Sequence, residues 1–186
     1  MLLIIDCGSP KIASIKDALG SRSSFCRIIK LALLSPEHLS AAKGVIISGS
    51  PILLTESYPK LFADKFSFLK DCKVPVLGIC FGLQVMGLVF GESVFMGEEV
   101  RGETEVVFLF DDPLLKDITM SAVFMEDHTE GVGLPDDDFF LLGSSEHYEV
   151  EVMKHKKKKI YGVQFHPEVS GENGKKILQN FSDMCF

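Results

Sequence analysis

One short segment, Gly78-Ile79-Cys80-Phe81-Gly82, constrains the fold of this chain more than any other. The residues before it, Val74–Leu77, predict a short buried strand, and Leu83–Phe90 predicts an apolar helix. A nucleophile with a glycine two residues away on each side, between a strand and a helix, is typical of a nucleophile elbow. We therefore expect a sharp, strained turn in which the first N–H groups of the helix point at the Cys80 sulfur and favour its thiolate.

A second motif supplies a base for this thiol. Ile160–Phe165 predicts a strand, and His166 follows it directly. Residues i and i+2 of an extended segment point the same way, so Glu168 can reach His166 and hold the tautomer that accepts a proton from Cys80. Taken alone, such a cysteine is usually a core residue and such a histidine a turn residue. The elbow and the His-x-Glu motif together predict a Cys80–His166–Glu168 triad.

The first half of the chain alternates short apolar strands with helices. The remaining strands expected there are Leu2–Asp6, Phe25–Ile29 and Gly44–Ser48, and the helices are Lys11–Leu19, Pro36–Ala42 and Pro59–Lys70. Leu61, Phe62, Phe66 and Leu69 are expected on one face of the last helix. This order predicts a parallel sheet covered on both faces, with its active site at the carboxyl ends of the strands.

After about Gly91 the pattern changes to successive strands. We expect Ser93–Met96, Thr104–Phe110, Ala122–Met125, Phe139–Ser144, Tyr148–Met153 and Ile160–Phe165, and then a helix over Gly174–Met184. The fold class is therefore α/β: an open, mostly parallel sheet with helices on both faces and a small antiparallel extension. No repeat, low-complexity tract or linker divides the sequence, so we expect a single domain over residues 1–186.

Composition excludes several function classes. No apolar run approaches the roughly 20 residues that span a membrane, and a net charge of −7 argues against nucleic-acid binding. The five cysteines include no CxxC pair, which argues against a disulfide framework or a metal site and favours a reducing cytoplasm. The one basic cluster, Lys154–Lys159, is best interpreted as a solvated hairpin turn.

From Leu2 to about Phe181, the sequence resembles the class I glutamine amidotransferases, in which a Cys-His-Glu triad hydrolyses glutamine and releases ammonia. Val150–Lys156, Ile160–Val169 and Lys176–Phe181 look most like the separate glutaminase subunit of a two-subunit GMP synthase. The resemblance implies a flavodoxin-like fold, glutamine as substrate and a glutamyl thioester. It also implies a separate ATP-pyrophosphatase (synthetase) subunit that uses the ammonia to aminate XMP.

The same resemblance bears on cofactors. Glutamine hydrolysis by such a triad needs no metal or organic cofactor. The sequence has no GxxxxGK[ST] phosphate-binding motif, so ATP and magnesium are expected on the partner subunit.

Further site residues follow from the reaction and the resemblance. The backbone N–H groups of Phe81 and Ser50 are the candidates for an oxyanion hole, with Gly49 beside the substrate. Ser50 stands where relatives usually carry a glycine, and serine resists the positive φ values that glycine accepts. Gln84 matches the family position that hydrogen-bonds substrate glutamine, although an exposed helix residue is the alternative.

The segment Asp127–Glu130 aligns with the family's Ser-His-Gly-Asp, whose backbone holds the amino-acid end of the substrate. We therefore expect His128 and Thr129 to bind glutamine, while Asp127 and Thr129 depart from the family pattern. Arg101-Gly102 either lines the glutamine pocket with its backbone or forms a surface turn.

Two other functions remain open. A standalone γ-glutamyl hydrolase or peptidase would use the same triad without ammonia transfer, and the Gly49-Ser50 turn favours it. A regulatory subunit with a catalytically drifted pocket is favoured by Ser50 and Asp127, but retention of the whole triad counts against it.

Overall fold

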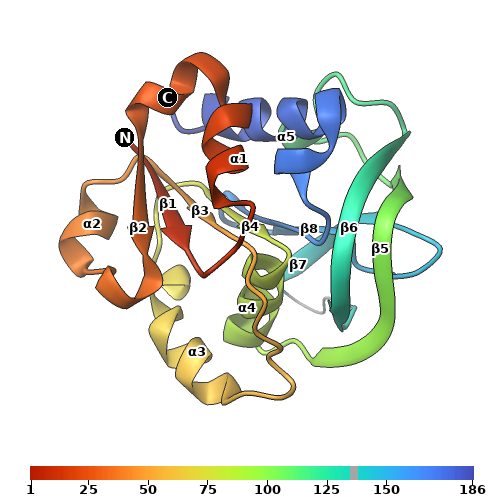
Figure 1. The fold of residues 1–186 in the computed structure, drawn as a ribbon, viewed down its shortest axis with the longest axis horizontal. Coiled ribbons are helices and arrows are strands. Elements are labelled where there is room, and N and C mark those ends of the chain that lie inside the picture. The colour runs from red at the N-terminus through yellow and green to blue at the C-terminus, as the bar shows by residue number, and fades with distance from the viewer. Residues whose placement is uncertain (135–137) are drawn as a thin grey trace.

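The computed structural model describes residues 1–134 and 138–186, whose strands form one nine-stranded sheet in the order β2-β1-β3-β4-β9-β8-β7-β5-β6 (Figure 1). The strands are β1 (Leu2–Asp6), β2 (Cys26–Lys30), β3 (Gly44–Ile47), β4 (Val76–Ile79), β5 (Val94–Phe108), β6 (Ser121–Val132), β7 (Phe139–Ser144), β8 (Val152–His155) and β9 (Ile160–Val163). The α-helices are α1 (Ile12–Ala18), α2 (Pro36–Ser40), α3 (Pro59–Lys65), α4 (Phe81–Phe90) and α5 (Gly171–Asp183).

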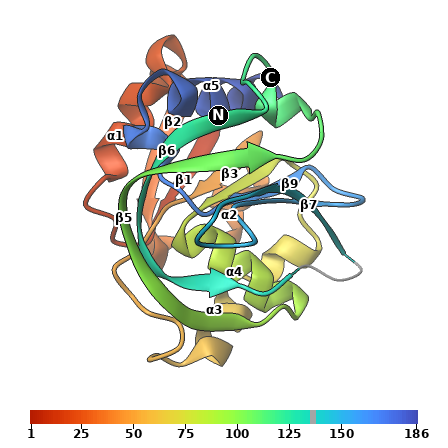
Figure 2. The ribbon, with the colours of Figure 1, turned by 90° about the vertical axis from the view of Figure 1, so that its right-hand side faces the viewer.

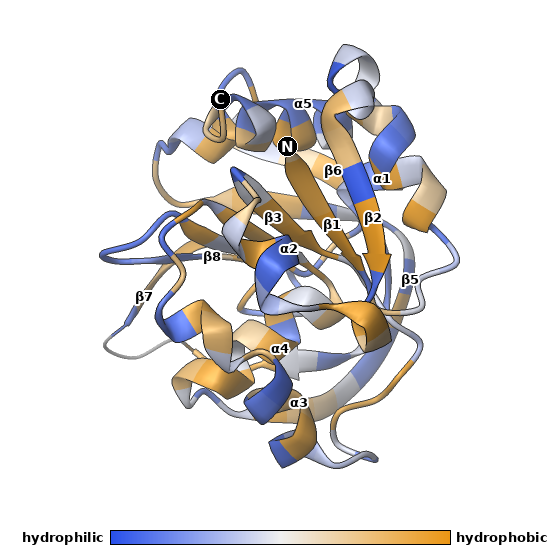
Figure 3. Cartoon of the chain, turned by 90° about the vertical axis from the view of Figure 1, so that its left-hand side faces the viewer, coloured by the Kyte–Doolittle hydropathy of each residue, from blue (hydrophilic) through white to orange (hydrophobic). Residues whose placement is uncertain are grey.

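The inner parallel strands β1, β3, β4 and β9 are buried on both faces, whereas the edge strand β2 is partly exposed. In β1, Leu2 and Ile4 pack into one hydrophobic cluster while Leu3 and Ile5 pack into the other, because successive strand residues point to opposite faces. Helices α1 and α5 lie over the first face, and α3 and α4 lie over the second (Figures 1 and 2). Strands β1 and β3 are accordingly hydrophobic along their length (Figure 3). The expected α/β fold is confirmed.

The parallel pairing brings the predicted site residues to one edge. Strand β4 pairs in parallel with β3 on one side and β9 on the other. The carboxyl ends of these three strands are therefore adjacent. Ser48–Pro51 follows β3, Cys80 follows β4, and Gln164–His166 follows β9.

The antiparallel extension contains the two longest strands of the sheet. Strands β5 and β6 form a long ribbon that curls around one side of the molecule (Figure 2), with a register shift between Met96 and Val100. Where the sequence predicted two strands, Ser93–Met96 and Thr104–Phe110, the structure has the single strand β5. The strand expected over Ala122–Met125 runs on to Val132, so it carries the Asp127–Glu130 segment.

Other element boundaries also need correction. The helix expected over Pro59–Lys70 ends at Lys65 and continues as a 3-10 turn, and Leu61 is 61% exposed instead of sharing the buried face with Phe66. Strand β8 begins at Val152 because Tyr148 closes a turn with Ser145, whose N–H donates to the Tyr148 carbonyl.

Lys156–Lys159 joins antiparallel β8 and β9, as the predicted hairpin requires. No helix in the described ranges is long and apolar enough to cross a membrane.

Candidate active site

Cys80 occupies the strained turn that the sequence predicts. It caps the N-terminus of α4 with φ +51° and ψ −106°, a conformation that side-chain-bearing residues rarely adopt. A Cβ atom on Gly78 would lie 2.5 Å from the Gly82 carbonyl carbon, and one on Gly82 would lie 2.6 Å from the Ile47 oxygen. Both flanking positions therefore need glycine, and the tight packing around Cys80 is confirmed.

The charge state of the thiol differs from the expectation. Burial, and after it the nearby Glu126 carboxyl, raise the pKa of Cys80 to about 12. The backbone N–H of Phe81 lowers this pKa, as the elbow predicts, but its effect is smaller than that of burial. The expected thiolate is therefore wrong for this structure, in which burial keeps Cys80 as a thiol.

His166 and Glu168 form the predicted contact. The Nδ1 atom of His166 lies 2.8 Å from Oε1 of Glu168, and the Glu168 side chain is fully buried. Ser170 holds this segment in place, since its hydroxyl donates to the His166 carbonyl and accepts from the N–H of Met125. A carboxylate on Nδ1 leaves Nε2 as the proton acceptor of the imidazole.

Most of the predicted site residues line one cavity of about 570 Å³. Those that line it are Ser50, Cys80, Gln84, His128, Thr129 and His166. Gly49, Phe81 and Glu168 are not among the residues that line the cavity. A Cβ on Gly49 would lie 3.0 Å from Cε1 of His166, so glycine at this position lets the imidazole lie close to the turn after β3.

The turn at Ser50 avoids the strain that the substitution suggested. Among the described residues, the only non-glycine residues with positive φ are Cys80 and Asp117, so Ser50 is accommodated without a left-handed backbone. Its hydroxyl accepts the N–H of Ile52.

Gln84 is buried, with 4% of its surface exposed, so the alternative of an exposed helix residue is wrong. Its side-chain N–H₂ donates to the Glu130 carbonyl at 2.9 Å and to Oε1 of Gln164 at 3.5 Å. These bonds fix the amide and leave its oxygen as the group that can meet a ligand in the cavity.

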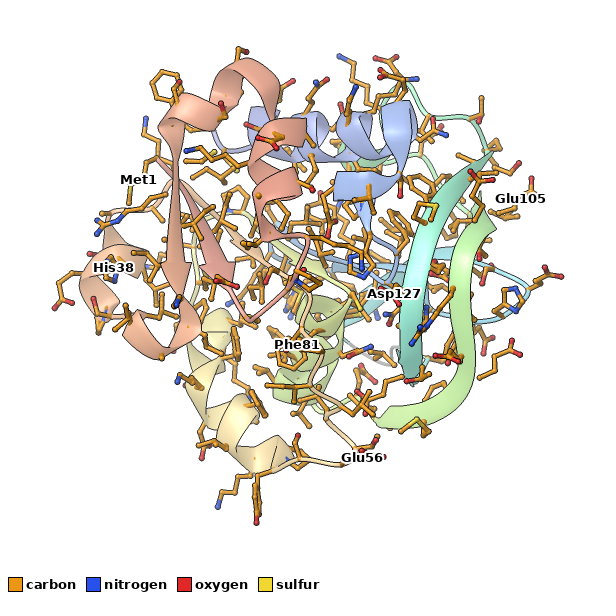
Figure 4. All side chains as sticks on the ribbon, in the orientation of Figure 1. Met1, His38, Glu56, Phe81, Glu105 and Asp127 are labelled. Atoms are coloured by element: carbon orange, nitrogen blue, oxygen red, sulfur yellow. The ribbon has the colours of Figure 1, made fainter. Side chains whose placement is uncertain are left out.

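Sequence reasoning missed a set of charges at the mouth of the cavity. Lys11 donates to Asp127 at 2.6 Å, and Arg101 approaches the same carboxylate at 3.5 Å. The Lys11 ammonium holds the pKa of Asp127 below its usual range. Arg101 belongs to β5 and lines the cavity, so the alternative of a surface turn is wrong. Figure 4 shows Asp127 on β6 and Phe81 at the start of α4.

The Glu130 side chain hydrogen-bonds the backbone of the loop that follows Ser50. Its two carboxylate oxygens accept the backbone N–H groups of Leu54 at 2.8 Å and Thr55 at 2.6 Å. The buried carboxylate therefore joins β6 to a loop that also lines the cavity.

The comparisons with known proteins agree with this geometry. A family model described as glutamine amidotransferase class-I matches residues 3–185. A glutamine-hydrolyzing GMP synthase of Caldanaerobacter subterraneus is 36% identical over 97% of this chain. The chain spans only 35% of the length of that relative. A protein of Methanococcus aeolicus that is named as one subunit of a glutamine-hydrolyzing GMP synthase is 34% identical, with 100% of this chain and 97% of the relative covered.

Solved structures give the same result. A protein from Thermoplasma acidophilum, described as a candidate GMP synthase subunit, is 28% identical with a TM-score of 0.89, over 99% of this chain and 92% of that one. A glutamine amidotransferase from Thermotoga maritima is 25% identical with a TM-score of 0.73, over 98% and 82%.

Proposed function

The chain belongs to the class I glutamine amidotransferase family, and we propose that it hydrolyses glutamine for a separate synthetase subunit that aminates XMP to GMP. The observation that carries the hydrolytic part is that His166, which lines the same cavity as Cys80, is held by Glu168 at 2.8 Å. The relatives that are named as single subunits of GMP synthase support the choice of partner.

In the proposed first half-reaction, the Cys80 sulfur attacks the side-chain carbonyl carbon of glutamine while its proton passes to Nε2 of His166. The high pKa of the buried thiol makes this transfer part of the attack. Glu168 stabilises the imidazolium that forms. The oxyanion is stabilised by the N–H groups of Phe81 and Ser50, each contributing on the order of 3 kcal/mol. The tetrahedral intermediate collapses as the C–N bond breaks, and His166 donates its proton to the departing nitrogen. Ammonia is released, and the glutamyl group remains on Cys80 as a thioester.

In the second half-reaction, His166 takes a proton from water, whose oxygen attacks the thioester carbon. The C–S bond breaks, the sulfur regains a proton and glutamate is released. The balance is one glutamine and one water converted to one glutamate and one ammonia. No step in this cycle requires a metal or an organic cofactor, and ATP and magnesium act on the partner subunit.

The substrate is held by the walls of the cavity. Gln84, fixed by Glu130 and Gln164, presents its oxygen to the glutamine, while His128 and Thr129 line the cavity around it and Gly49 lies in the turn behind Ser50. Lys11, Arg101 and Asp127 place both signs of charge at the mouth, which suits the ammonium and carboxylate of a free amino acid. The five free cysteines support a reducing, cytoplasmic location for the enzyme.

The test measures glutamate release from glutamine by the purified chain, alone and with a GMP synthase ATP-pyrophosphatase subunit plus XMP, ATP and magnesium. The proposal expects strong stimulation by the loaded partner and loss of release in Cys80→Ala. Vigorous release without a partner, extending to γ-glutamyl peptides, would instead show a standalone hydrolase. No release under either condition would contradict the assignment to this synthetase.

A further inference from the structure

Three buried ionisable side chains meet behind the wall of the cavity. Glu126 and His128 come from the inward face of β6, and Glu151 immediately precedes β8. Their exposed fractions are 2%, 8% and 1%, respectively. One ligand atom from each lies within 4.8 Å of the others, and no second group of this kind occurs in residues 1–134 and 138–186. The proposed glutamine chemistry uses neither glutamate.

The surrounding hydrogen bonds leave specific atoms pointing into the cluster. Nδ1 of His128 lies 2.9 Å from the Glu130 carbonyl, which can only accept, so Nδ1 carries the hydrogen and Nε2 carries a lone pair. Ser145 donates to Oε1 of Glu151 at 2.7 Å and leaves Oε2 free. An imidazole that donates its other N–H to a carbonyl, and a carboxylate held on one oxygen, are the usual supports of metal ligands.

The inward atoms have no hydrogen-bond partner. Both oxygens of Glu126, Nε2 of His128 and Oε2 of Glu151 are enclosed and unsatisfied within the described part of the chain. Unpaired buried groups of this kind are costly, and two carboxylates together are costlier still. A cation at the centre of the cluster would satisfy these inward atoms.

One distance in the cluster is compatible with two ligands of a shared ion. Nε2 of His128 is 3.1 Å from Oε2 of Glu126, yet the two atoms make no hydrogen bond. Two ligands that each lie about 2.1 Å from one tetrahedral ion are separated by about 3.4 Å. The observed separation is close to that value.

We propose that Glu126, His128 and Glu151 bind one divalent transition-metal ion, for which Zn²⁺ is the best fit. Nε2 of His128, the two Glu126 oxygens and Oε2 of Glu151 supply four donors, and a mixed imidazole and carboxylate set suits zinc. The enclosure leaves no open coordination position, so the ion is structural. The ion links β6 to the segment before β8 and fixes the orientation of the His128 imidazole. The sequence predicted no metal site, since these ligands follow no recognisable spacing.

The test is calorimetric titration of Zn²⁺ into the chelator-treated full-length chain, carried out on the wild type and on single variants. Glu126→Gln keeps the shape of the ligand but removes its charge, and Glu149→Gln makes the same change at an exposed residue. Cys80→Ala and His147→Ala remove two other possible zinc ligands, the thiol beside His166 and the exposed imidazole beside Glu98.

The proposal expects one Zn²⁺ per chain in the wild type and in the Glu149, Cys80 and His147 variants. Glu126→Gln should bind at least about 100-fold more weakly, because the loss of a ligand costs no less than the loss of a supporting hydrogen bond. Absence of wild-type binding would overturn the site, as would binding that survives in Glu126→Gln and disappears in Cys80→Ala or His147→Ala.

A second measurement does not depend on any variant folding. The zinc X-ray absorption spectrum of the wild-type complex should show one imidazole and oxygen neighbours with no sulfur. A sulfur neighbour would place the ion on a cysteine and contradict the proposal.

Discussion

Replacement of Gly78 by alanine tests whether the elbow holds Cys80 in its reactive position. The new Cβ would lie 2.5 Å from the carbonyl carbon of Gly82, 2.6 Å from its oxygen and 2.8 Å from the N–H nitrogen of Leu83. All three are backbone atoms, so no side-chain rotation relieves the contact. Ordinary van der Waals contact begins at 3.4 Å, so the first turn of α4 must move by about 0.9 Å.

That displacement is large on the scale of catalysis. A shift of about 1 Å in a catalytic group costs on the order of 100-fold in rate, and overpacking costs about 1–3 kcal/mol of stability. We therefore expect Gly78→Ala to fold with a reduced free energy of unfolding and to release glutamate about 100-fold more slowly. An electrophilic glutamine analogue should alkylate its Cys80 more slowly by a similar factor, as measured by mass spectrometry.

The matched control is Val76→Ala on the same strand. Val76 is fully buried, and its truncation should cost about 1–3 kcal/mol without displacing the elbow. Its catalytic rate should stay near that of the wild type at temperatures where it is folded. A wild-type rate in Gly78→Ala, or equal loss in both variants, would refute the argument from the elbow.

Three further predictions follow from named contacts. Glu168→Gln should lower kcat at least about 10-fold with little change in KM, because the amide cannot stabilise the imidazolium; an unchanged kcat in steady-state kinetics would contradict this. Glu130→Gln should lose about 1–3 kcal/mol and speed hydrogen exchange at the amides of Leu54 and Thr55, and protection equal to the wild type would contradict it. Burial raises the pKa of Cys7 from 9.0 to about 12, so its contribution to stability is complete below pH 9 and is lost towards pH 12. Between pH 9 and 11, the urea-measured stability of Cys7→Ala should fall less steeply than that of the wild type, by up to about 1.4 kcal/mol per pH unit, and parallel curves would show the prediction wrong.

The parallel half of the fold could be predicted from sequence because its signals are local. Each strand there is a short apolar run, and the elbow needs only five consecutive residues. The His166–Glu168 contact was also predictable, since two-residue spacing in an extended segment fixes which side chains share a side.

The long ribbon was harder to predict because its inward face carries charge. Glu126, His128 and Glu130 continue the buried alternation of Phe124, but their polarity made the strand seem to end at Met125. Their burial depends on partners from other elements, such as the Leu54 and Thr55 amides and the hydroxyl of Ser145. No local pattern contains those partners.

The protonation of Cys80 was mispredicted for a similar reason. The elbow motif correctly placed the Phe81 N–H where it lowers the pKa of the thiol. The stronger effects, burial and the Glu126 carboxyl, come from the packed sheet and from β6. The charges of Lys11, Asp127 and Arg101 likewise meet only when three distant segments fold together.

The most direct test of the proposed function is a search for the glutamyl thioester on Cys80. The chain is mixed with glutamine, with the loaded synthetase subunit present, quenched in acid during turnover and examined by peptide mass spectrometry. We predict one glutamyl group on the peptide that contains Cys80, and neither adduct nor glutamate release in Cys80→Ala. Full glutamate release by Cys80→Ala, or turnover with the adduct on another residue, would contradict the proposal.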